Sequence, residues 1–160
     1  GSKLPVLVDV NWPKMEKGAD EDQITLRQLR FWERAPSTPA ALSKAGVTYA
    51  FYSGGLNDPN EILKNVKKAI DAGLSPDDAL KALTITPAQM FGVADRLGSV
   101  QQGKIANLVV ADGDIFNEKT KIKDVFVDGR RYEIHEEPAS GPPGEAKPTP
   151  SDKNSGEARP

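Results

Sequence analysis

The sequence has no cysteine and a single histidine, His135, among its 160 residues. Without cysteine, the chain cannot form a disulfide framework, a thiolate metal site or a cysteine nucleophile. One histidine cannot supply a site built from several imidazole groups, and its position near the end of the last expected strand predicts a solvated side chain. Two of the residue types that bind transition metals in proteins are therefore almost missing.

The sequence also has no long apolar run and no strong excess of charge. Its apolar stretches all fall short of the roughly 18 residues that a transmembrane helix needs. The formal net charge is −2, which gives no electrostatic reason to expect nucleic acid or an anionic membrane as a partner. We expect neither partner, and 160 residues are enough for one ordinary domain with its own core.

The two ends of the sequence are unlike its middle. Gly1 and Ser2 resemble the scar of a cleaved expression tag, and nothing in the sequence indicates a cellular compartment. Residues 136–160 are dominated by Pro, Gly, Ser and charged residues and contain no large apolar side chain. Such a composition cannot bury enough surface to offset the entropy of ordering the chain. We expect residues 136–160 to form a disordered tail or an interdomain linker.

Strands alternate with helices in the first part of the sequence. Residues 4–11 and 47–52 are the expected strands, rich in β-branched or aromatic side chains. The expected helices span residues 23–34, residues 38–44, and a stretch from Asp58 or Asn60 to Ala72. We expect the first helix to be capped by Asp22 and to pack Phe31 and Trp32 against a sheet. Alternating strands and helices favour a parallel sheet with right-handed crossover connections.

After residue 97 the pattern changes to strands only. The strand candidates are residues 105–111, of which 107–111 read as a buried strand, residues 122–127 and residues 131–135. Asp128 and Gly129 stand between the last two and are a strong signal for a hairpin turn. The sequence thus predicts an α/β part over residues 3–97, followed by a small β part over residues 98–135.

An ordered set of helix signals begins at residue 73. Gly73 can end the preceding helix in a left-handed conformation. Ser75 is a good N-cap, and Pro76 suits the first position of the next helix. Leu80 and Leu83 belong to an apolar stripe on that helix, so we expect both to be buried.

Two strings in this region, GLSPDDALKALTITPA and LGSVQQGKIANLVVAD, resemble the C-terminal region of the amidohydrolase superfamily. In that superfamily of metal-dependent hydrolases of C–N and related bonds, a helix of the type GLSPxxALxxxTxxPA precedes the string LGSxxxGKxADLVVxD. The chain departs from this pattern at Asn107, where Asp is usual. It is similar to the imidazolonepropionase and prolidase-like branch.

The resemblance implies that the chain is a fragment of a larger fold. It implies the last βα units of a TIM-barrel-like domain, followed by a few antiparallel strands of a small composite β domain. A full barrel has eight units and takes about 250 residues, whereas this chain has room for about two. The implied partner is the remainder of the parent polypeptide, which would supply the missing strands of the barrel and of the β domain.

The resemblance also implies a metal site to which this chain brings no ligand. The family holds zinc or another divalent metal with several histidines and with an aspartate at the end of the last barrel strand. Here the expected last barrel strand, residues 47–52, is followed by Ser53 and Gly54 where that aspartate is usual. Serine cannot replace a carboxylate as a ligand or a base. We expect no metal-binding and no cofactor-binding residue in this chain.

Two carboxylates, Asp9 and Asp58, are the remaining candidates for chemistry. Asp9 lies near the end of the first expected strand, and Asp58 lies several residues after the second, where it more often caps the next helix. Both could still face the mouth of a cleft. Paired carboxylates in such places can act as acid and base. Carboxylates at strand and loop ends are more often simply solvated, so we treat both residues as weak candidates for catalysis.

Three functions are compatible with these features. The first is a C-terminal scaffold portion of an amidohydrolase-like protein, a hydrolase acting on C–N bonds other than peptide bonds, which is not catalytic alone. The alternatives are a degenerate amidohydrolase-derived binding or interaction module and a divergent, active metal-dependent hydrolase. Missing neighbours would leave unpaired N–H and C=O groups at strand edges, which favours self-association or partial disorder of the isolated chain.

Overall fold

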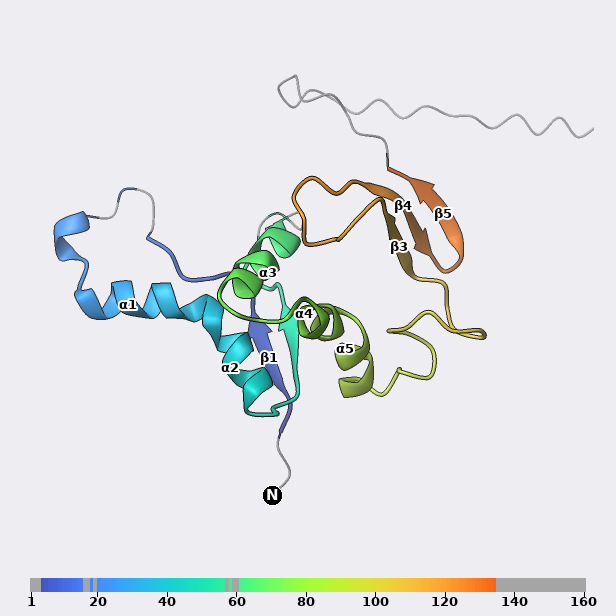
Figure 1. The fold of residues 1–160 in the computed structure, drawn as a ribbon, viewed down its shortest axis with the longest axis horizontal. Helices are drawn as coiled ribbons and strands as arrows, with labels where there is room; N and C mark the ends of the chain where they lie inside the picture. The colour runs from blue at the N-terminus through green and yellow to red at the C-terminus, as the bar shows by residue number, and fades with distance from the viewer. Residues whose placement is uncertain (1–3, 16–17, 19, 57, 59–60, 135–160) are drawn as a thin grey trace, which may run out of the picture.

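The computed structural model of the chain describes residues 4–15, 18, 20–56, 58 and 61–134 (Figure 1). Within them, the chain forms a parallel sheet of two strands and an antiparallel sheet of three. The parallel strands are β1 (Val6–Asp9) and β2 (Tyr49–Tyr52), and the antiparallel strands are β3 (Leu108–Ala111), β4 (Ile122–Val127) and β5 (Arg130–Glu133). Gly1, Ser2, His135 and the expected tail lie outside the described residues.

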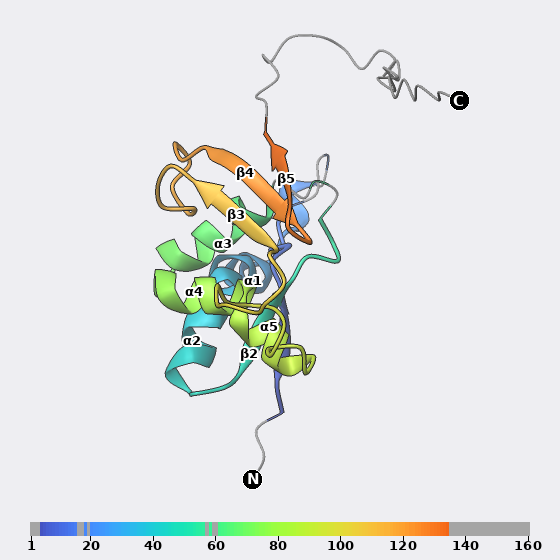
Figure 2. The ribbon, with the colours of Figure 1, turned by 90° about the vertical axis from the view of Figure 1, so that its right-hand side faces the viewer.

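Helices connect and cover the parallel strands. Between β1 and β2 lie η1 (Glu21–Gln23), α1 (Leu26–Arg34), η2 (Ala35–Ser37) and α2 (Thr38–Lys44), and after β2 come α3 (Glu61–Asp71), α4 (Pro76–Leu83) and α5 (Ile85–Met90). Figure 2 shows α2, α3 and α4 on one side of the strand pair. A helical crossover between parallel strands is the predicted arrangement. No helix in the described part of the chain has the length and apolar character needed to span a bilayer.

The core lies between the strand pair and the helices. Val8 and Val10 alternate along the chain and are buried, as are Tyr49 at the start of β2, Val66 of α3 and Leu74 just before α4. In the parallel register, Val8 lies beside Phe51 of β2, so both side chains point to the covered face. The alternation of apolar residues in β1 therefore does set which face packs against helices.

Most of the other face of the strand pair is exposed, although Ala50 on it is buried. Leu7, Asp9 and Tyr52 lie on it, and all three are exposed. In a βα barrel the helices form the outer layer and the strand faces away from them point to the interior. This largely exposed face is therefore the one that would line the inside of a barrel.

Helix α1 begins later than the sequence indicates and is not packed against a sheet. Its N-cap is Thr25, whose side chain accepts a hydrogen bond from the backbone N–H of Gln28, while Gln28 Oε1 accepts one from the backbone N–H of Thr25. This capping box is a better start than Asp22, the predicted cap, because it satisfies two backbone N–H groups at once. No residue of α1 is buried, and Phe31 is 63% exposed. The prediction that Phe31 packs against a sheet is wrong: α1 projects from the body (Figure 1).

Helix α4 has the predicted start but a different buried face. Ser75 accepts a hydrogen bond from the backbone N–H of Asp78 at 3.1 Å, as expected of an N-cap. The buried residues are Ala79 and Ala82, whereas Leu80 is 46% exposed. The prediction that Leu80 is buried is wrong, because small alanines let α4 approach β2 and α5 closely. Leu83 is half-buried against the core.

The antiparallel sheet contacts the rest of the protein through the β3–β4 connection and not through one of its own faces. Asp128 and Gly129 form the predicted hairpin turn, both with positive φ (49° and 80°). The prediction that β3 is a buried strand is wrong, since Val109 and Val110 are 51% and 42% exposed. Phe116, in the connection between β3 and β4, is the residue from this region that enters the core.

Candidate functional site

The carboxyl ends of β1 and β2 form the candidate site. The two strands are parallel, so their ends meet at one edge of the sheet, where ligands bind in α/β folds. Asp9 lies directly beside Tyr52 in the strand register. The pairing continues one residue further, because the backbone N–H of Val10 donates to the carbonyl of Tyr52 at 2.9 Å.

Asn11 ties this edge together after β1 ends. Its side-chain Nδ2 donates to the carbonyl of Gly55 at 2.8 Å, and its backbone N–H donates to Asp9 Oδ1 at 2.9 Å. A Cβ added to Gly55 would lie 2.6 Å from Asn11 Nδ2, so a larger residue there would push the amide away. The turn after β2 is thereby held against the end of β1.

Tyr52 occupies the space over the turn that follows β2. A Cβ added to Gly54 would lie 1.9 Å from the Tyr52 hydroxyl oxygen and 2.1 Å from its ring carbon Cζ. Only glycine at position 54 therefore permits this tyrosine orientation. The hydroxyl group stands beside the residues where the family pattern has its aspartate.

The structure places the predicted site residues in two groups. Asp9, Ser53 and Gly54 lie at the carboxyl edge, as the expected strand ends require. Asp58 is exposed and lies before α3, where its carbonyl accepts a hydrogen bond from the backbone of Glu61 at 3.0 Å. Nothing tests a catalytic role for Asp9 or Asp58, so both stay predictions.

Asn11 and Tyr52 were missed by sequence reasoning. The available signal was their position: Tyr52 ends the second expected strand, and Asn11 follows the first. A parallel pairing of these strands would have placed both at one edge. The register that sets Tyr52 beside Asp9 depends on tertiary packing and cannot be predicted from the sequence of either strand alone.

The donor set at this edge does not fit the metal site that the resemblance implies. Its residues offer one carboxylate, Asp9, together with an amide and hydroxyl groups, and one oxygen of that carboxylate already accepts the Asn11 N–H. In the described part of the chain, no three His, Cys, Asp or Glu side chains come close enough to bind one ion. Zinc sites are built from imidazole, thiolate and carboxylate groups, so no step through a metal is derived for these residues.

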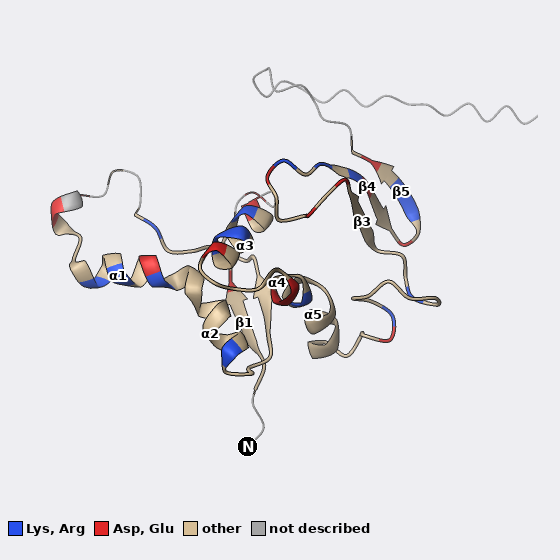
Figure 3. Cartoon of the chain, viewed as in Figure 1, with Lys and Arg blue, Asp and Glu red and all other residues tan. Residues whose placement is uncertain are grey.

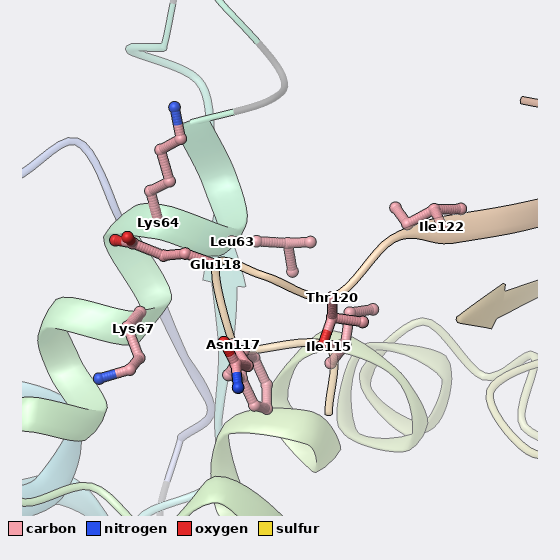
Figure 4. Close-up of a pocket in the computed structure, with 9 residues that line it drawn as sticks. Leu63, Lys64, Lys67, Ile115, Asn117, Glu118, Thr120 and Ile122 are labelled. Atoms are coloured by element: carbon pink, nitrogen blue, oxygen red, sulfur yellow. The ribbon is translucent and has the colours of Figure 1, made fainter. Parts of the chain in front are cut away.

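A cleft of about 520 Å³ lies elsewhere, between α3 and the β3–β4 connection (Figure 4). Leu63 projects across it toward Ile115, while Lys64 and Glu118 lie at its outer side. A second cleft, of about 250 Å³, reaches toward the carboxyl edge and includes Asn11 in its wall. Neither Asp9 nor Asp58 lines the larger cleft. The larger cleft is therefore separate from the candidate site.

The residues whose pKa values are shifted by their surroundings also lie away from this edge. Burial raises the pKa of the Tyr49 phenol, and the hydrogen bond with Ser43 opposes that shift. The backbone N–H of Lys121 lowers the pKa of Asp112. Asp124 raises the pKa of Arg131 in the antiparallel sheet. Positive and negative residues are interspersed on α3 and β5 (Figure 3), as expected for solvated faces.

The fold and the carboxyl edge together define a class, the βα-barrel type of α/β protein. A model of the amidohydrolase family matches residues 33–132, which is more than half of the chain. The chain therefore belongs to the amidohydrolase family. It holds the last βα units of a TIM-barrel-like domain and a small antiparallel sheet after them.

Curated relatives give the same family. An adenine deaminase of Lactobacillus delbrueckii subsp. bulgaricus is 34% identical over 84 residues, covering 49% of this chain and 14% of the relative. An adenine deaminase of Moorella thermoacetica is 40% identical over 65 residues, covering 41% and 10%. An imidazolonepropionase of Flavobacterium johnsoniae is 29% identical over 99 residues, covering 59% and 24%. The chain thus spans less than a quarter of the length of each of these three relatives.

Solved structures agree on the fold. An amidohydrolase from Thermotoga maritima MSB8 superimposes with a TM-score of 0.58 at 33% identity, covering 62% of this chain and 26% of that one. A Xaa-Pro dipeptidase with bound methionine in its active site gives a TM-score of 0.56 at 22% identity, with coverage of 68% and 28%. The second likeness concerns the fold alone.

Proposed function

We propose that the chain is the C-terminal scaffold portion of an amidohydrolase-like protein, a hydrolase acting on C–N bonds other than peptide bonds. The observation that carries this proposal is the largely exposed face of the β1–β2 pair. Leu7, Asp9 and Tyr52 are exposed on it, although the helices bury the opposite face. A strand pair with one helical layer needs further strands to enclose an interior.

The second part of the proposal is that the chain does not catalyse the reaction alone. In metal-dependent hydrolases the metal activates water and a carboxylate accepts its proton. Ser53 stands where the family has its aspartate, and a serine hydroxyl is neither the ligand nor the base that this step uses. The remainder of the parent polypeptide would have to supply the metal ligands and the missing barrel strands.

The test is metal content and turnover of the purified chain. We expect substoichiometric zinc after preparation without chelators, and no turnover of adenine, a dipeptide or a cyclic amide with added zinc. A Ser53→Asp variant should remain inactive too, because a single added carboxylate does not complete a site.

Stoichiometric zinc with turnover that a chelator abolishes would contradict this proposal and favour the divergent active hydrolase. The sequence of the parent protein decides between the scaffold and the degenerate binding module. A preceding His-x-His segment supports the scaffold, whereas unrelated flanking domains favour a degenerate binding module.

A further inference from the structure

The cleft between α3 and the β3–β4 connection has an apolar part and a charged outer side. Its volume of about 520 Å³ lies within the range of roughly 300–1,000 Å³ that is usual for small-molecule pockets. Leu63 of α3 faces Ile115 across it, and Ile122 at the start of β4 continues the apolar wall (Figure 4). Lys64 and Glu118 lie at the outer side. A ligand that fills this cleft therefore needs an apolar part with its charges at one end.

Both walls of the cleft are held by contacts within the chain. Phe116 of the connection is 6% exposed, and its backbone N–H donates to Asp114 Oδ1 at 3.0 Å. The backbone N–H of Asn117 donates to the Asp114 carbonyl, and that of Thr120 donates to the Asn117 carbonyl, each at 2.9 Å. The opposite wall belongs to α3, which is fixed in the core by its buried Val66. The cleft is thus formed without a ligand.

The pairing of the charged residues that line the cleft decides which charges are available to a ligand. Lys67 forms an ion pair with Asp71, one turn later on α3. Among the described residues, neither Lys64 nor Glu118 has an ion-pair partner. One positive and one negative group therefore stand unmatched in the wall of the same cleft.

We propose that this cleft binds a free apolar α-amino acid such as leucine. The carboxylate of the amino acid contacts the Lys64 ammonium, and its own ammonium contacts the Glu118 carboxylate. Its side chain lies between Leu63 and the two isoleucines, Ile115 and Ile122. Burial of that side chain supplies most of the affinity, because ion pairs at exposed positions contribute little.

The distribution of charge selects an amino acid over simpler amphipathic molecules. Both charges of an α-amino acid are attached to one carbon, so both stay at the outer side while the side chain enters the apolar part. An apolar carboxylic acid would place its charge near the like charge of Glu118, and an apolar amine would do the same at Lys64. Neither Asp9 nor Ser53 lines this cleft, so the inference is independent of the proposed scaffold function.

The experiment is a titration of the isotope-labelled chain with leucine, followed by amide and methyl NMR shifts. We expect saturable shifts confined to residues 63–67 and 115–122. Two analogues each lack one charge: 4-methylpentanoate has no ammonium, and isoamylamine has no carboxylate. Each should bind about threefold more weakly than leucine, the loss expected for one exposed ion pair. Glycine, which has both charges and no side chain, should give no saturable shifts.

Variants assign each charge of the ligand to its partner. Lys64→Gln should weaken leucine binding about threefold and leave isoamylamine binding unchanged. Glu118→Gln should weaken leucine binding to a similar extent and should not weaken binding of 4-methylpentanoate. Lys44→Gln is the matched control, because Lys44 is exposed at the end of α2 and does not line the cleft. Its affinity for leucine should equal that of the unmodified chain.

The apolar wall is tested separately. Ile122→Thr keeps a branched side chain in β4 but places a hydroxyl in the wall, and it should weaken leucine binding. Since Lys64 and Glu118 are exposed, their variants decide the proposal even if Ile122→Thr does not fold. An absence of saturable shifts, shifts elsewhere in the chain, or equal binding of leucine by Lys64→Gln and Lys44→Gln would overturn it. Tighter binding of 4-methylpentanoate than of leucine would overturn it too, because Glu118 would then make no favourable contact with the ligand.

Discussion

At the scale of single residues, Tyr49 is a polar side chain whose properties are set by burial. Tyr49 is 5% exposed, and its hydroxyl lies 3.1 Å from the Ser43 hydroxyl. Its ring meets Phe51 edge to face, with ring centroids 5.8 Å apart. A buried phenol of this kind keeps its proton because the charged form would lose solvation without gaining a cation.

The first prediction concerns stability at high pH. The unfolded chain ionises Tyr49 near its ordinary value of 10.0, whereas burial raises the pKa in the folded state. The stabilising contribution is therefore complete below pH 10 and is lost as the pH rises through the folded pKa. Denaturant unfolding between pH 8 and about pH 11 should show a smaller decline in unfolding free energy for Tyr49→Phe than for the unmodified chain.

Tyr132→Phe is the control for this measurement, since that ring is exposed. Its stability should follow the unmodified chain across the pH range. Parallel decline of all three proteins would contradict a perturbed Tyr49.

The second prediction compares Leu74, which directly precedes the cap of α4, with Leu80 within α4. Leu74 is 3% exposed and Leu80 is 46% exposed. Leu74→Ala should lower the unfolding free energy by about 2–5 kcal/mol, because it opens a cavity in the core. Leu80→Ala should change it by less than about 0.5 kcal/mol, as surface substitutions do. Chemical denaturation measures both, and comparable losses would mean that α4 buries a different face.

At the scale of whole elements, the main link between the antiparallel sheet and the body is the connection between β3 and β4. Phe116 enters the core from this connection, and its backbone N–H donates to Asp114 Oδ1 at 3.0 Å. On the other side, the Trp12 indole donates to the Asn65 carbonyl of α3 at 2.8 Å. Helix α3 thus receives a contact from the end of β1 and packs near the β3–β4 connection.

The third prediction follows from this anchoring. Phe116→Ala should lower the unfolding free energy by about 3–5 kcal/mol, the usual cost of truncating a buried phenylalanine. Phe91→Ala is the matched control, because Phe91 is 70% exposed at the end of α5, and it should change stability by less than about 0.5 kcal/mol. Amide exchange should also show faster opening of β4 in Phe116→Ala. An unchanged midpoint would mean that the sheet is held by other contacts.

At the scale of the molecule, the described strands leave several sheet edges without a neighbour. β1 and β2 pair only with each other, and β3 and β5 stand at the outside of their sheet. β5 carries Arg130, Arg131 and Glu133, charges that discourage pairing with another chain. β3 carries no charge and exposes two valines. The two edges of the same sheet therefore differ in their protection against association.

The fourth prediction is that the isolated chain associates with itself as concentration rises. Sedimentation velocity should show a concentration-dependent increase in mean mass. Val109→Lys should reduce it, because a charge on β3 opposes strand pairing. Val127→Lys is the control: Val127 is 47% exposed but belongs to the central strand β4, whose neighbours already pair with it.

Equal suppression by both variants would point to face packing instead of edge pairing. A strictly monomeric chain with strong amide protection in both sheets would contradict the expectation and would show that the fragment closes on itself.

The sequence by itself determined the features whose physical causes lie within a few residues. Ser75 caps α4 because the hydroxyl reaches an N–H three positions ahead, and Asp128 with Gly129 forms a turn because both adopt positive φ. The motif around α4 was sufficient to indicate the family. The predicted parallel pairing also followed from the order of strands and helices, which permits few other connections.

Only the tertiary structure decided which faces are covered and which residues meet. Leu80 satisfies the helical stripe as well as Ala79 does, but the close approach of α4 to β2 and α5 buries the smaller side chain. Likewise Tyr52 and Asp9 are 43 positions apart, and the strand register alone sets them side by side. The reason is physical: a face or a pair is chosen by long-range packing, which local patterns constrain but do not select.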